Sequence, residues 1–584
     1  MGKRQRNNRW STITWRVWAV IGAIAFGTLV VSLRLVQLQI VEHKQYAEQA
    51  RNSHIAQETI TDRRGALLDR NGYPLAASQD TYDVMVERDN WEDPAIARAQ
   101  AAELSKATGV PAATMVDIVS SVDVFEVPVA KNLSYEKAEA VRELGFGGVR
   151  LIDSSRRVHP EGNLAAALLG FIGQDNIGLT GLEADLNSVL VGSNGVITYE
   201  TDGLGKMLNI GDRTEMPPLA GSNVVLSIDR YIQGIAEQQL QKTIDAHKAS
   251  GGSVIVVRPA TGEILAMASR PSIDVTKPDI GNSNPDLFRN RSVTDAYEPG
   301  SVFKLYTMAA ALDLGLVTPE TSWYDSGALT FEDWTIRNWD LSANGDQTVT
   351  QILTKSLNTG AAWLSSLCGP ENFYTYVQNF GFGAASNSGL SGEAAGEVRS
   401  PVTDPSGWAG VDLATNSFGQ GISATPLQVA MALAAIANDG MLMKPQFVKQ
   451  IVGTDGAQTI EPESVRQVIK SDTAHTLLTM MGEVAGYIST NYLDVPGYRV
   501  GGKTGTANLA DDNGSYIPDT YISSFAGVAP LDDPEIAVLV KIDKPKGVPW
   551  GSAVAAPVFS EIANKVLPYL GIAPTESALV QDVQ

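Results

Sequence analysis

Three short motifs in this chain of 584 residues place hydroxyl, amine and amide side chains at spacings that suit acyl transfer. In Ser301-Val302-Phe303-Lys304, the hydroxyl and the amine lie one helical turn apart on the same face of a predicted helix. A lysine that is partly buried and close to another cation can be neutral and accept the proton of the serine. The N-terminus of that helix would place its N–H groups where negative charge develops. This pattern predicts a serine nucleophile that is activated by lysine.

The second and third motifs add polar groups of the kind that such a reaction needs. Ser356-Leu357-Asn358 follows a helix-like run at Val349–Lys355, and Lys503-Thr504-Gly505 lies in a strand-like segment with glycines at 501, 502 and 505. Glycines of this kind let a substrate backbone approach the strand. The motifs follow one another 55 and 147 residues apart, in the order of the active-site set of penicillin-recognising acyl-serine enzymes.

Each motif alone also has a structural explanation. Ser134-Tyr135-Glu136-Lys137 repeats the first spacing, but its serine more simply caps a surface helix. Ser-x-Asn recurs at Ser342 and at Ser489, where we interpret the side chains as polar groups of loops. The sequence has no Gly-x-Ser-x-Gly motif, so a serine activated by histidine is not supported. The combination of the three motifs, rather than any one of them, favours acyl-serine chemistry.

Composition and charge exclude several other classes of protein. The 44 basic and 65 acidic side chains give a net charge of −21, which argues against nucleic acid as a partner. A mean hydropathy of −0.04 excludes a polytopic membrane protein. The single cysteine, Cys368, excludes an intramolecular disulfide and is expected to be a small buried apolar residue. None of the five histidines is spaced for a helical metal site, so we expect no metal.

An apolar segment near the N-terminus predicts a membrane anchor. Val17–Leu33 carries no charge, and Leu35–Val41 continues it beyond Arg34. Five basic residues and no acidic one precede the segment, so the positive-inside rule places the N-terminus in the cytoplasm and the bulk of the chain outside the cell membrane. Ala23-Ile24-Ala25 resembles the cleavage site of a signal peptide, but the apolar run before it is short and continues well past it. We therefore predict an uncleaved single-pass helix.

The exported part combines helical and strand-like segments and predicts an α+β fold. Helices are expected after Val41 and at Pro94–Gly109, Tyr135–Leu144, Leu164–Phe171, Tyr231–Lys242 and Pro557–Leu570; strands are expected at Val224–Ile228, Ser253–Val257, Ile264–Ala268, Tyr498–Ala507, Tyr521–Val528 and Ile536–Ile542. Because strands are expected at both ends of residues 216–570, we predict a sheet assembled from distant parts of the chain. The predicted division is a cytoplasmic tail (1–16), an anchor (17–40), an N-terminal pedestal domain (41–215), a domain with the three motifs (216–570) and a C-terminal tail (571–584).

From about Arg64 to Phe559 the sequence resembles the class B penicillin-binding proteins, which are monofunctional peptidoglycan D,D-transpeptidases. Besides the three motifs, the resemblance rests on the stretches Arg64–Ala76, Arg157–Gly162, Gly181–Glu183, Asn290–Lys304 and Phe418–Gln428. One difference is His159, where members of the family usually carry an aromatic residue. The resemblance implies an elongated pedestal, a transpeptidase domain with a β-lactamase-like sheet flanked by helices, and neither a metal nor an organic cofactor.

The resemblance also implies a role for the residues of the first two motifs and for Lys503. Ser301 would attack the carbonyl of the penultimate D-Ala of a stem peptide and release the terminal D-Ala. Lys304 would be the base, and Lys503 would help to keep it neutral. Ser356 would pass a proton to the leaving amine, held by Asn358 and Lys503.

The remaining residues of the third motif would hold the substrate. Thr504, Gly505 and Thr506 would form the substrate-binding strand, with the two threonines on the substrate carboxylate. The backbone N–H groups of Ser301 and Thr506 would form the oxyanion hole. An amine from a neighbouring stem peptide would resolve the acyl-enzyme and complete the cross-link, and β-lactams would acylate the same serine. The partner that the resemblance implies is a polytopic glycosyltransferase of the shape, elongation, division and sporulation family.

Other functions share these motifs. Glu183-Ala184-Asp185-Leu186-Asn187 matches the Glu-x-x-Leu-Asn pattern of a β-lactamase but lies before Ser301 instead of after it, so we interpret the match as coincidence. A D,D-carboxypeptidase, which admits water in place of the amine, is not excluded by any residue. A non-catalytic β-lactam sensor would need a larger cytoplasmic part than 16 residues. Division and elongation enzymes share all these residues, and the compact pedestal and the Phe418–Gly421 stretch favour the division type.

Overall fold

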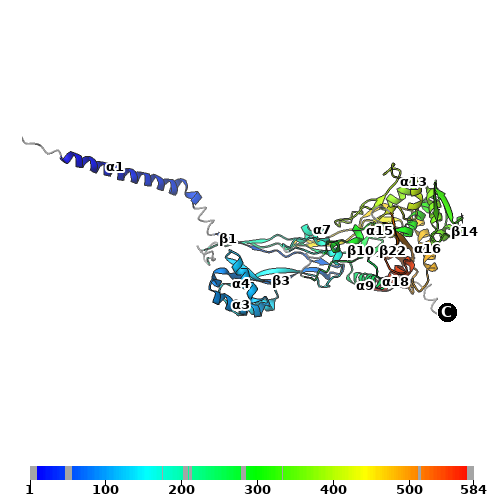
Figure 1. Ribbon diagram of the computed structural model, residues 1–584, viewed down its shortest axis with the longest axis horizontal. Coiled ribbons are helices and arrows are strands. Elements are labelled where there is room, and N and C mark those ends of the chain that lie inside the picture. The colour runs from blue at the N-terminus through cyan, green and yellow to red at the C-terminus, as the bar shows by residue number, and fades with distance from the viewer. Residues whose placement is uncertain are drawn as a thin grey trace, which may run out of the picture. The chain divides into compact units, whose positions relative to one another are not determined.

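The computed structural model describes residues 9–46, 55–173, 175–201, 208, 213–277, 284–331, 333–510 and 515–574 (Figure 1). The chain separates into two compact units: Met1–Asp62 with Ser193–Leu219, and Arg63–Gly192 with Ala220–Gln584. Residues 1–8 of the predicted cytoplasmic tail and residues 575–584 of the predicted C-terminal tail lie outside the described residues.

The first unit contains the apolar helix and a small sheet. Helix α1 (Arg9–Val36) continues into the π-helical turn η1 (Gln37–Val41). The helical segment Trp15–Val41 has 27 residues and a hydropathy of 2.1, so it is long and apolar enough to cross a bilayer. Strands β1 (Ile55–Ile60), β6 (Gly195–Glu200) and β7 (Arg213–Met216) form an antiparallel sheet in the order β1-β6-β7. Of the helix expected after Val41, the structure shows a helical turn at 43–46, and residues 47–54 lie outside the described part.

In the second unit, three helices pack on an antiparallel sheet to form the predicted pedestal. The helices are α3 (Pro94–Thr108), α4 (Ala112–Ser121) and α5 (Tyr135–Glu143), and the strands are β3 (Pro74–Glu87), β4 (Glu126–Leu133) and β5 (Val149–Val158). The Asp93 carboxylate caps α3, and Gly109 ends it in the left-handed region at φ 85°. Ser134 Oγ accepts the N–H of Lys137 at 3.5 Å, which confirms that this serine caps a helix.

A longer sheet joins the pedestal to the following region. Its order is β19-β18-β8-β2-β3-β4, with β5 paired to β3; the added strands are β2 (Leu67–Leu68), β8 (Asn223–Leu226), β18 (Val448–Gly453) and β19 (Gly456–Thr459). The helix expected at Leu164–Phe171 is a single turn, α6 (Ala166–Leu169). It is short because Ala165 and Gly170, with φ of 56° and 75°, leave the helical region on either side. Two further short helices follow, α7 (Gly181–Asp185) and α8 (Asn187–Leu190).

A five-stranded antiparallel sheet forms the centre of the region with the three motifs. Its order is β10 (Glu263–Arg270), β9 (Gly251–Arg258), β23 (Ile536–Asp543), β22 (Tyr516–Ala529) and β21 (Gly501–Ala510). Two of the strands come from the beginning of this region and three from its end. The prediction of a sheet assembled from distant parts of the chain is therefore confirmed, and the third motif lies on the edge strand β21.

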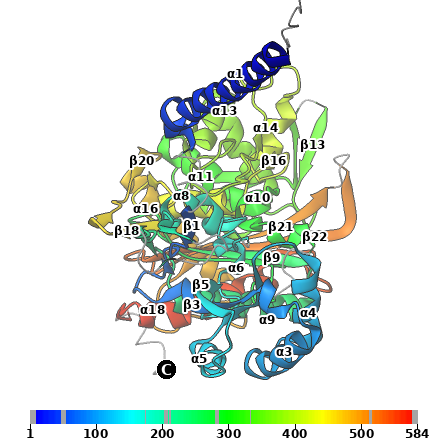
Figure 2. The same cartoon turned by 90° about the vertical axis from the view of Figure 1, so that its left-hand side faces the viewer.

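Helices cover both faces of this sheet (Figure 2). Val254 and Val256 of β9 pack with α9 (Arg230–His247) and α18 (Ala556–Tyr569), which lie below the sheet in Figure 2. Ile255 and Val257 point to the opposite face and pack in the cluster that contains α15 (Pro426–Ile436). All four side chains are fully buried, which explains why β9 is a continuous apolar run without alternation.

The chain between β10 and β21 contains helices and short paired strands. Besides α15, its helices are η4 (Pro285–Phe288), α10 (Arg291–Thr294), η5 (Gly300–Phe303), α11 (Lys304–Asp313), α12 (Val349–Thr354), α13 (Asn358–Asn379), α14 (Gly410–Asn416) and α16 (Ser471–Tyr487). The short strands pair as β11 (Ser322–Asp325) with β14 (Gly345–Thr348), β12 (Ala328–Phe331) with β13 (Trp334–Arg337), β15 (Glu397–Val398) with β16 (Ile422–Ser423), and β17 (Met441–Met443) with β20 (Ser464–Gln467). The α+β class predicted from the sequence is confirmed.

Candidate active site

The first motif lies on a tight turn that leads into a buried helix. Ser301 belongs to the 3₁₀ turn η5 and is partly exposed, whereas Lys304 begins α11 and is 1% exposed. The distance from Lys304 Nζ to Ser301 Oγ is 3.1 Å. The structure therefore places the amine within hydrogen-bonding distance of the hydroxyl, as the spacing of the motif predicts.

The second motif forms an elbow between two helices, which we define as residues 355–358. Helix α12 ends before the elbow, Ser356 takes the left-handed conformation at φ 58°, and α13 begins at Asn358. This geometry directs three oxygens at Lys304 Nζ: Ser356 O at 2.6 Å, Asn358 Oδ1 at 2.8 Å and Ser356 Oγ at 3.2 Å. The left-handed conformation is unfavourable for a residue with a Cβ, so the surrounding contacts must hold it.

These contacts suit a neutral amine at Lys304. Two of the oxygens, Ser356 O and Asn358 Oδ1, can only accept, so they take the two N–H groups of a neutral amine. Its lone pair is then left for the hydroxyl proton of Ser301 or of Ser356. Burial lowers the pKa of Lys304 well below its ordinary value, and the charge of Lys503 lowers it further. Lys304 thus has both the geometry and the electrostatics of a base.

The third motif lies on β21, with its lysine buried. Lys503 is 1% exposed, and burial lowers its pKa to about 7. Its Nζ donates to Thr504 O at 3.0 Å and contacts Thr504 Oγ1 at 3.4 Å; among the described contacts of Lys503, none is a direct hydrogen bond to Ser356. Thr506 Oγ1 accepts the N–H of Gly551 at 3.2 Å. A Cβ at Gly505 would lie 2.3 Å from Ser524 Oγ, so the packing beneath the strand already requires glycine there.

A loop at Ser417–Ala424, which contains the Phe418–Gly421 stretch, contacts the turn Gly300–Phe303 from the other side; because this turn carries the predicted nucleophile, Ser301, we name it the nucleophile turn. Gly300 donates its N–H to Gly419 O at 3.1 Å, and Gly421 donates its N–H to Glu298 Oε1 at 2.8 Å. A Cβ at Gly419 would lie 2.3 Å from Gly300 O, so glycine permits this close approach. The contacts agree with the prediction that this stretch shapes the site without taking part in the chemistry.

Sequence reasoning missed one residue next to the site, Asn338. Its side chain accepts the N–H groups of Asn358 and Thr359, and it belongs to none of the motifs. The signal that could have indicated it is the apolar residue Leu357 at the N-cap of α13, because a helix without a capping side chain of its own needs acceptors from elsewhere.

The β-lactamase-like pattern around Glu183 is explained by a buried ionic cluster in α7. Glu183 is fully buried and binds Arg64 Nε at 2.6 Å and Arg157 Nε at 2.7 Å through its two carboxylate oxygens. Arg64 also binds Asn187 Oδ1 at 2.8 Å, so both ends of the pattern belong to this cluster. Burial lowers the pKa of the neighbouring His159. The pattern therefore has a structural cause, as we interpreted it from its position in the sequence.

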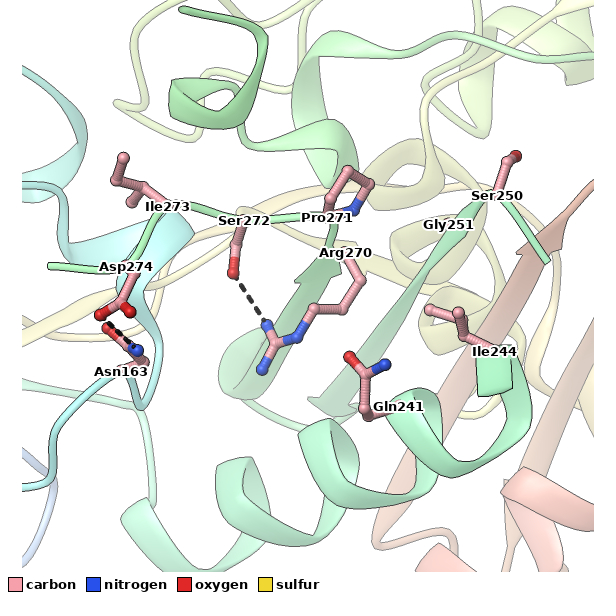
Figure 3. Close-up of a pocket in the computed structure, with 10 residues that line it drawn as sticks. All are labelled: Asn163, Gln241, Ile244, Ser250, Gly251, Arg270, Pro271, Ser272, Ile273 and Asp274. Carbon is pink, nitrogen blue, oxygen red and sulfur yellow. Dashed lines mark hydrogen bonds between the residues drawn. The ribbon is translucent and has the colours of Figure 1, made fainter. Parts of the chain in front are cut away.

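A pocket of about 340 Å³ lies elsewhere in the second unit, between the start of β9, the end of β10 and α9 (Figure 3). Its polar side chains already have hydrogen-bond partners: Arg270 donates to Ser272 Oγ at 3.2 Å and pairs with Glu237, outside the lining, at 2.7 Å, and Asn163 donates to Asp274 Oδ1 at 2.7 Å. Gln241 donates to Asp245 and Ser250 to Asp543 O. None of its lining residues belongs to the three motifs. Within the described part of the chain, no group of three or more His, Cys, Asp or Glu side chains is arranged to hold a metal ion.

Comparisons with known proteins agree with this geometry. Residues 252–564 match the penicillin binding protein transpeptidase domain, and residues 59–226 match the penicillin-binding protein dimerisation domain. The chain is 33% identical to stage V sporulation protein D of Bacillus subtilis, covering 97% of this chain and 87% of that one. It is 32% identical to the probable peptidoglycan D,D-transpeptidase PenA of Neisseria meningitidis, covering 98% and 96%.

The solved structures give the same result. Penicillin binding protein 3 from Mycobacterium tuberculosis, solved in complex with aztreonam, superposes with a TM-score of 0.68 at 27% identity and covers 89% of this chain and 99% of that one. The matched domains cover the sheet, the pedestal and all three motifs. The chain is therefore a member of the class B penicillin-binding proteins, the peptidoglycan D,D-transpeptidases, and its serine beside a buried lysine lies between an edge strand and a helical elbow.

Proposed function

We propose that Ser301 is the nucleophile of this transpeptidase and that Lys304 is its base. The observation that carries the proposal is the 3.1 Å distance between Lys304 Nζ and Ser301 Oγ, with the amine held by two oxygens that can only accept. Among the lysines of the three motifs, Lys304 is the one in contact with the nucleophile. Burial and the charge of Lys503 lower its pKa, so that its neutral form is populated at lower pH than that of an exposed lysine.

In acylation, Ser301 Oγ forms a bond with the carbonyl carbon of the penultimate D-Ala while its proton passes to Lys304 Nζ. The oxyanion is bound by the backbone N–H groups of Ser301 and Thr506. The C–N bond to the terminal D-Ala then breaks, and the leaving nitrogen takes a proton through Ser356 Oγ, which lies 3.2 Å from Lys304 Nζ. The products are an acyl-enzyme and free D-Ala.

In deacylation, the amine of a second stem peptide attacks the ester carbonyl. The amine loses a proton to Lys304, and Ser301 Oγ leaves and recovers a proton. Thr504 and Thr506 would hold the donor carboxylate before D-Ala leaves, with Gly505 between them on the strand. Penicillins acylate Ser301 in the same way, but their ring-opened product keeps the leaving group attached, which blocks the acceptor.

The proposal is tested by intact mass spectrometry of the full chain in detergent, before and after addition of benzylpenicillin. We expect a mass increase of one drug molecule, absent in Ser301→Ala. Ser134→Ala is the matched control, because Ser134 and Lys137 repeat the spacing but cap a helix. Lys304→Ala is expected to slow acylation about 10²- to 10⁴-fold, the usual contribution of a general base. Full labelling of Ser301→Ala would refute the assignment.

The lifetime of the adduct and a cross-linking assay separate the other functions. Loss of the adduct within minutes, with hydrolysed drug, would indicate a β-lactamase. A stable adduct without any release of D-Ala from a stem peptide would indicate a sensor. Release of D-Ala without incorporation of an acceptor amine would indicate a carboxypeptidase. We expect incorporation of the acceptor, with one D-Ala released for each cross-link.

We also propose that the N-terminus lies in the cytoplasm and that the helix Trp15–Val41 contacts a membrane-embedded glycosyltransferase. The basic residues before the helix support the orientation. Protease added to intact spheroplasts should digest residues 63–574, whereas inside-out vesicles should protect them. Exchange of residues 17–40 for an unrelated single-pass helix should abolish co-purification of the glycosyltransferase.

A further inference from the structure

Helix α13, which carries Asn358, is capped by a side chain from 20 residues earlier in the chain. The residue at its N-cap, Leu357, has no polar side chain. Instead, Asn338 Oδ1 accepts the N–H of Asn358 at 3.1 Å and the N–H of Thr359 at 3.3 Å. The single hydroxyl proton of Thr359 is shared between Asn338 Oδ1 at 2.8 Å and Asp325 Oδ1 at 2.9 Å. Asn338 is 2% exposed and Thr359 is fully buried, so solvent does not replace this acceptor.

The residue before Asn338 fixes the side chain of Asn358. Asn358 Nδ2 donates to Arg337 O at 3.1 Å, and its Oδ1 accepts from Lys304 Nζ at 2.8 Å. Strand β13 ends at Arg337, so the end of β13 and the residue after it hold both the backbone and the carboxamide of Asn358. The position of one ligand of Lys304 is therefore set by a segment that does not touch Lys304.

Two acceptors, the buried carboxylate of Asp325 and the backbone oxygen of Ser342, decide which way Asn338 faces. Asn338 Nδ2 donates to Asp325 Oδ2 at 2.8 Å and to Ser342 O at 3.0 Å, and because both oxygens only accept, the Oδ1 of Asn338 must face α13. Asp325 is fully buried and also accepts from Gly327 N, Thr359 Oγ1 and both nitrogens of Asn344, at 2.8 to 3.2 Å. Burial opposes its charge, but the hydrogen bonds, that of Asn344 first, outweigh burial and lower the pKa of Asp325.

We propose that Asn338 is a positioning residue for acylation, and that Asp325, together with the backbone oxygen of Ser342, orients it. By capping α13, Asn338 holds the elbow in which Ser356 is left-handed and in which Ser356 O and Asn358 Oδ1 take the N–H groups of Lys304. Without the cap, the first turn of α13 loses its acceptor, the elbow relaxes, and the lone pair of Lys304 no longer points at Ser301. The proposal rests on the proposed role of Lys304 as the base.

The test measures the limiting acylation rate and the apparent dissociation constant separately, with a fluorescent penicillin and the full chain in detergent. For Asn338→Ala we expect the limiting rate to fall about 10- to 100-fold, the loss typical of a misplaced catalytic group. The dissociation constant should stay within about twofold, and the final labelling should still reach one per chain. Asp325→Asn should lower the same rate by a smaller factor, because it removes the carboxylate that orients Asn338 but leaves Ser342 O in place.

A matched control and a double variant separate positioning from folding. Asn372→Ala removes another asparagine of α13, one that donates to Cys368 O further along the helix, and it should leave the rate unchanged. Asn338→Ala combined with Lys304→Ala should be little slower than Lys304→Ala alone, because Asn338 acts by positioning the groups that hold Lys304.

Three results would overturn the proposal. The first is a limiting rate of Asn338→Ala equal to that of the wild type, and the second is such a rate with a smaller fraction of chains labelled at the end. The third is a double variant whose rate is lowered by the product of the two single losses. Failure of the proposed function is distinguishable from these, since Ser301→Ala would then still take up the label.

Discussion

Replacement of Gly419 by alanine is expected to slow the acylation of Ser301 about 100-fold. Gly419 has a φ of 77°, and an added Cβ would lie 2.3 Å from Gly300 O and 2.9 Å from the Cβ of Phe303. Gly300 directly precedes the nucleophile, and its N–H is bound to Gly419 O. Because the nearest obstacle is backbone, rotation of a side chain cannot relieve the collision.

The magnitude follows from two separate costs. Alanine in the left-handed region costs about 1 kcal/mol of folding free energy. To bring the Cβ contact from 2.3 Å to an ordinary van der Waals distance, the nucleophile turn and the loop must move apart by about 1 Å, and a displacement of that size can cost about 100-fold in rate. At 1.36 kcal/mol for each factor of ten, this corresponds to about 2.7 kcal/mol in the activation barrier.

Gly315→Ala separates the two costs, because Gly315 has a similar φ of 68° but nothing within 4 Å of its added Cβ. Both variants should lower the midpoint of thermal unfolding, but only Gly419→Ala should slow acylation by a fluorescent penicillin. An acylation rate for Gly419→Ala within about threefold of wild type, at full final labelling, would refute the reasoning, since the turn would then tolerate the displacement.

Three further predictions concern buried ionisable groups. Glu183→Ala should lower the free energy of unfolding in urea by about 3–5 kcal/mol, because it leaves two buried arginines without their carboxylate. The lifetime of the penicillin adduct should not change in this variant. A longer lifetime would mean that Glu183 activates water for hydrolysis of the adduct. The acylation rate should rise with pH as Lys304 loses its proton, because only the neutral amine is a base. Lys503→Met should move this rise to higher pH, because it removes a charge that lowers the pKa of Lys304. A stopped-flow pH profile of both proteins checks the direction of the shift. Cys368 is 3% exposed, and burial raises the pKa of its thiol to about 12, so iodoacetamide at pH 8 should label it only after denaturation, and labelling of the folded chain would contradict this.

The sequence predicted those features that depend on residues close together in the chain. Ser301 and Lys304 are three positions apart, so a single helical turn brings them together, and the structure has them at 3.1 Å. The elements with apolar periodicity, such as α3 and β23, lie within a few residues of their predicted bounds. The helix at Leu164–Phe171 was predicted too long because periodicity does not show that Ala165 is left-handed.

Features that depend on tertiary contacts could not be predicted in this way. Asn338 reaches Asn358 only because β13 returns to the start of α13, and nothing in the local sequence marks an asparagine that caps a helix 20 residues later. The glycine at 505 was attributed to the approach of substrate, whereas the structure shows that Ser524 leaves no room for a side chain. Strand β1 was missed because its partner, β6, lies far away in the sequence.

The order of strands in the central sheet has a consequence for how the chain folds. Strand β23 lies between β9 and β22, and its Val540 pairs with Val254, 286 positions earlier. Closing so long a loop is slow, because the chain must lose conformational entropy before the strand pairing contributes any stabilising free energy. A chain that stops before Ile536 would contain all eight predicted site residues, but β9–β10 and β21–β22 would remain two separate hairpins. The protein can therefore bind a penicillin only after nearly its whole length has left the ribosome.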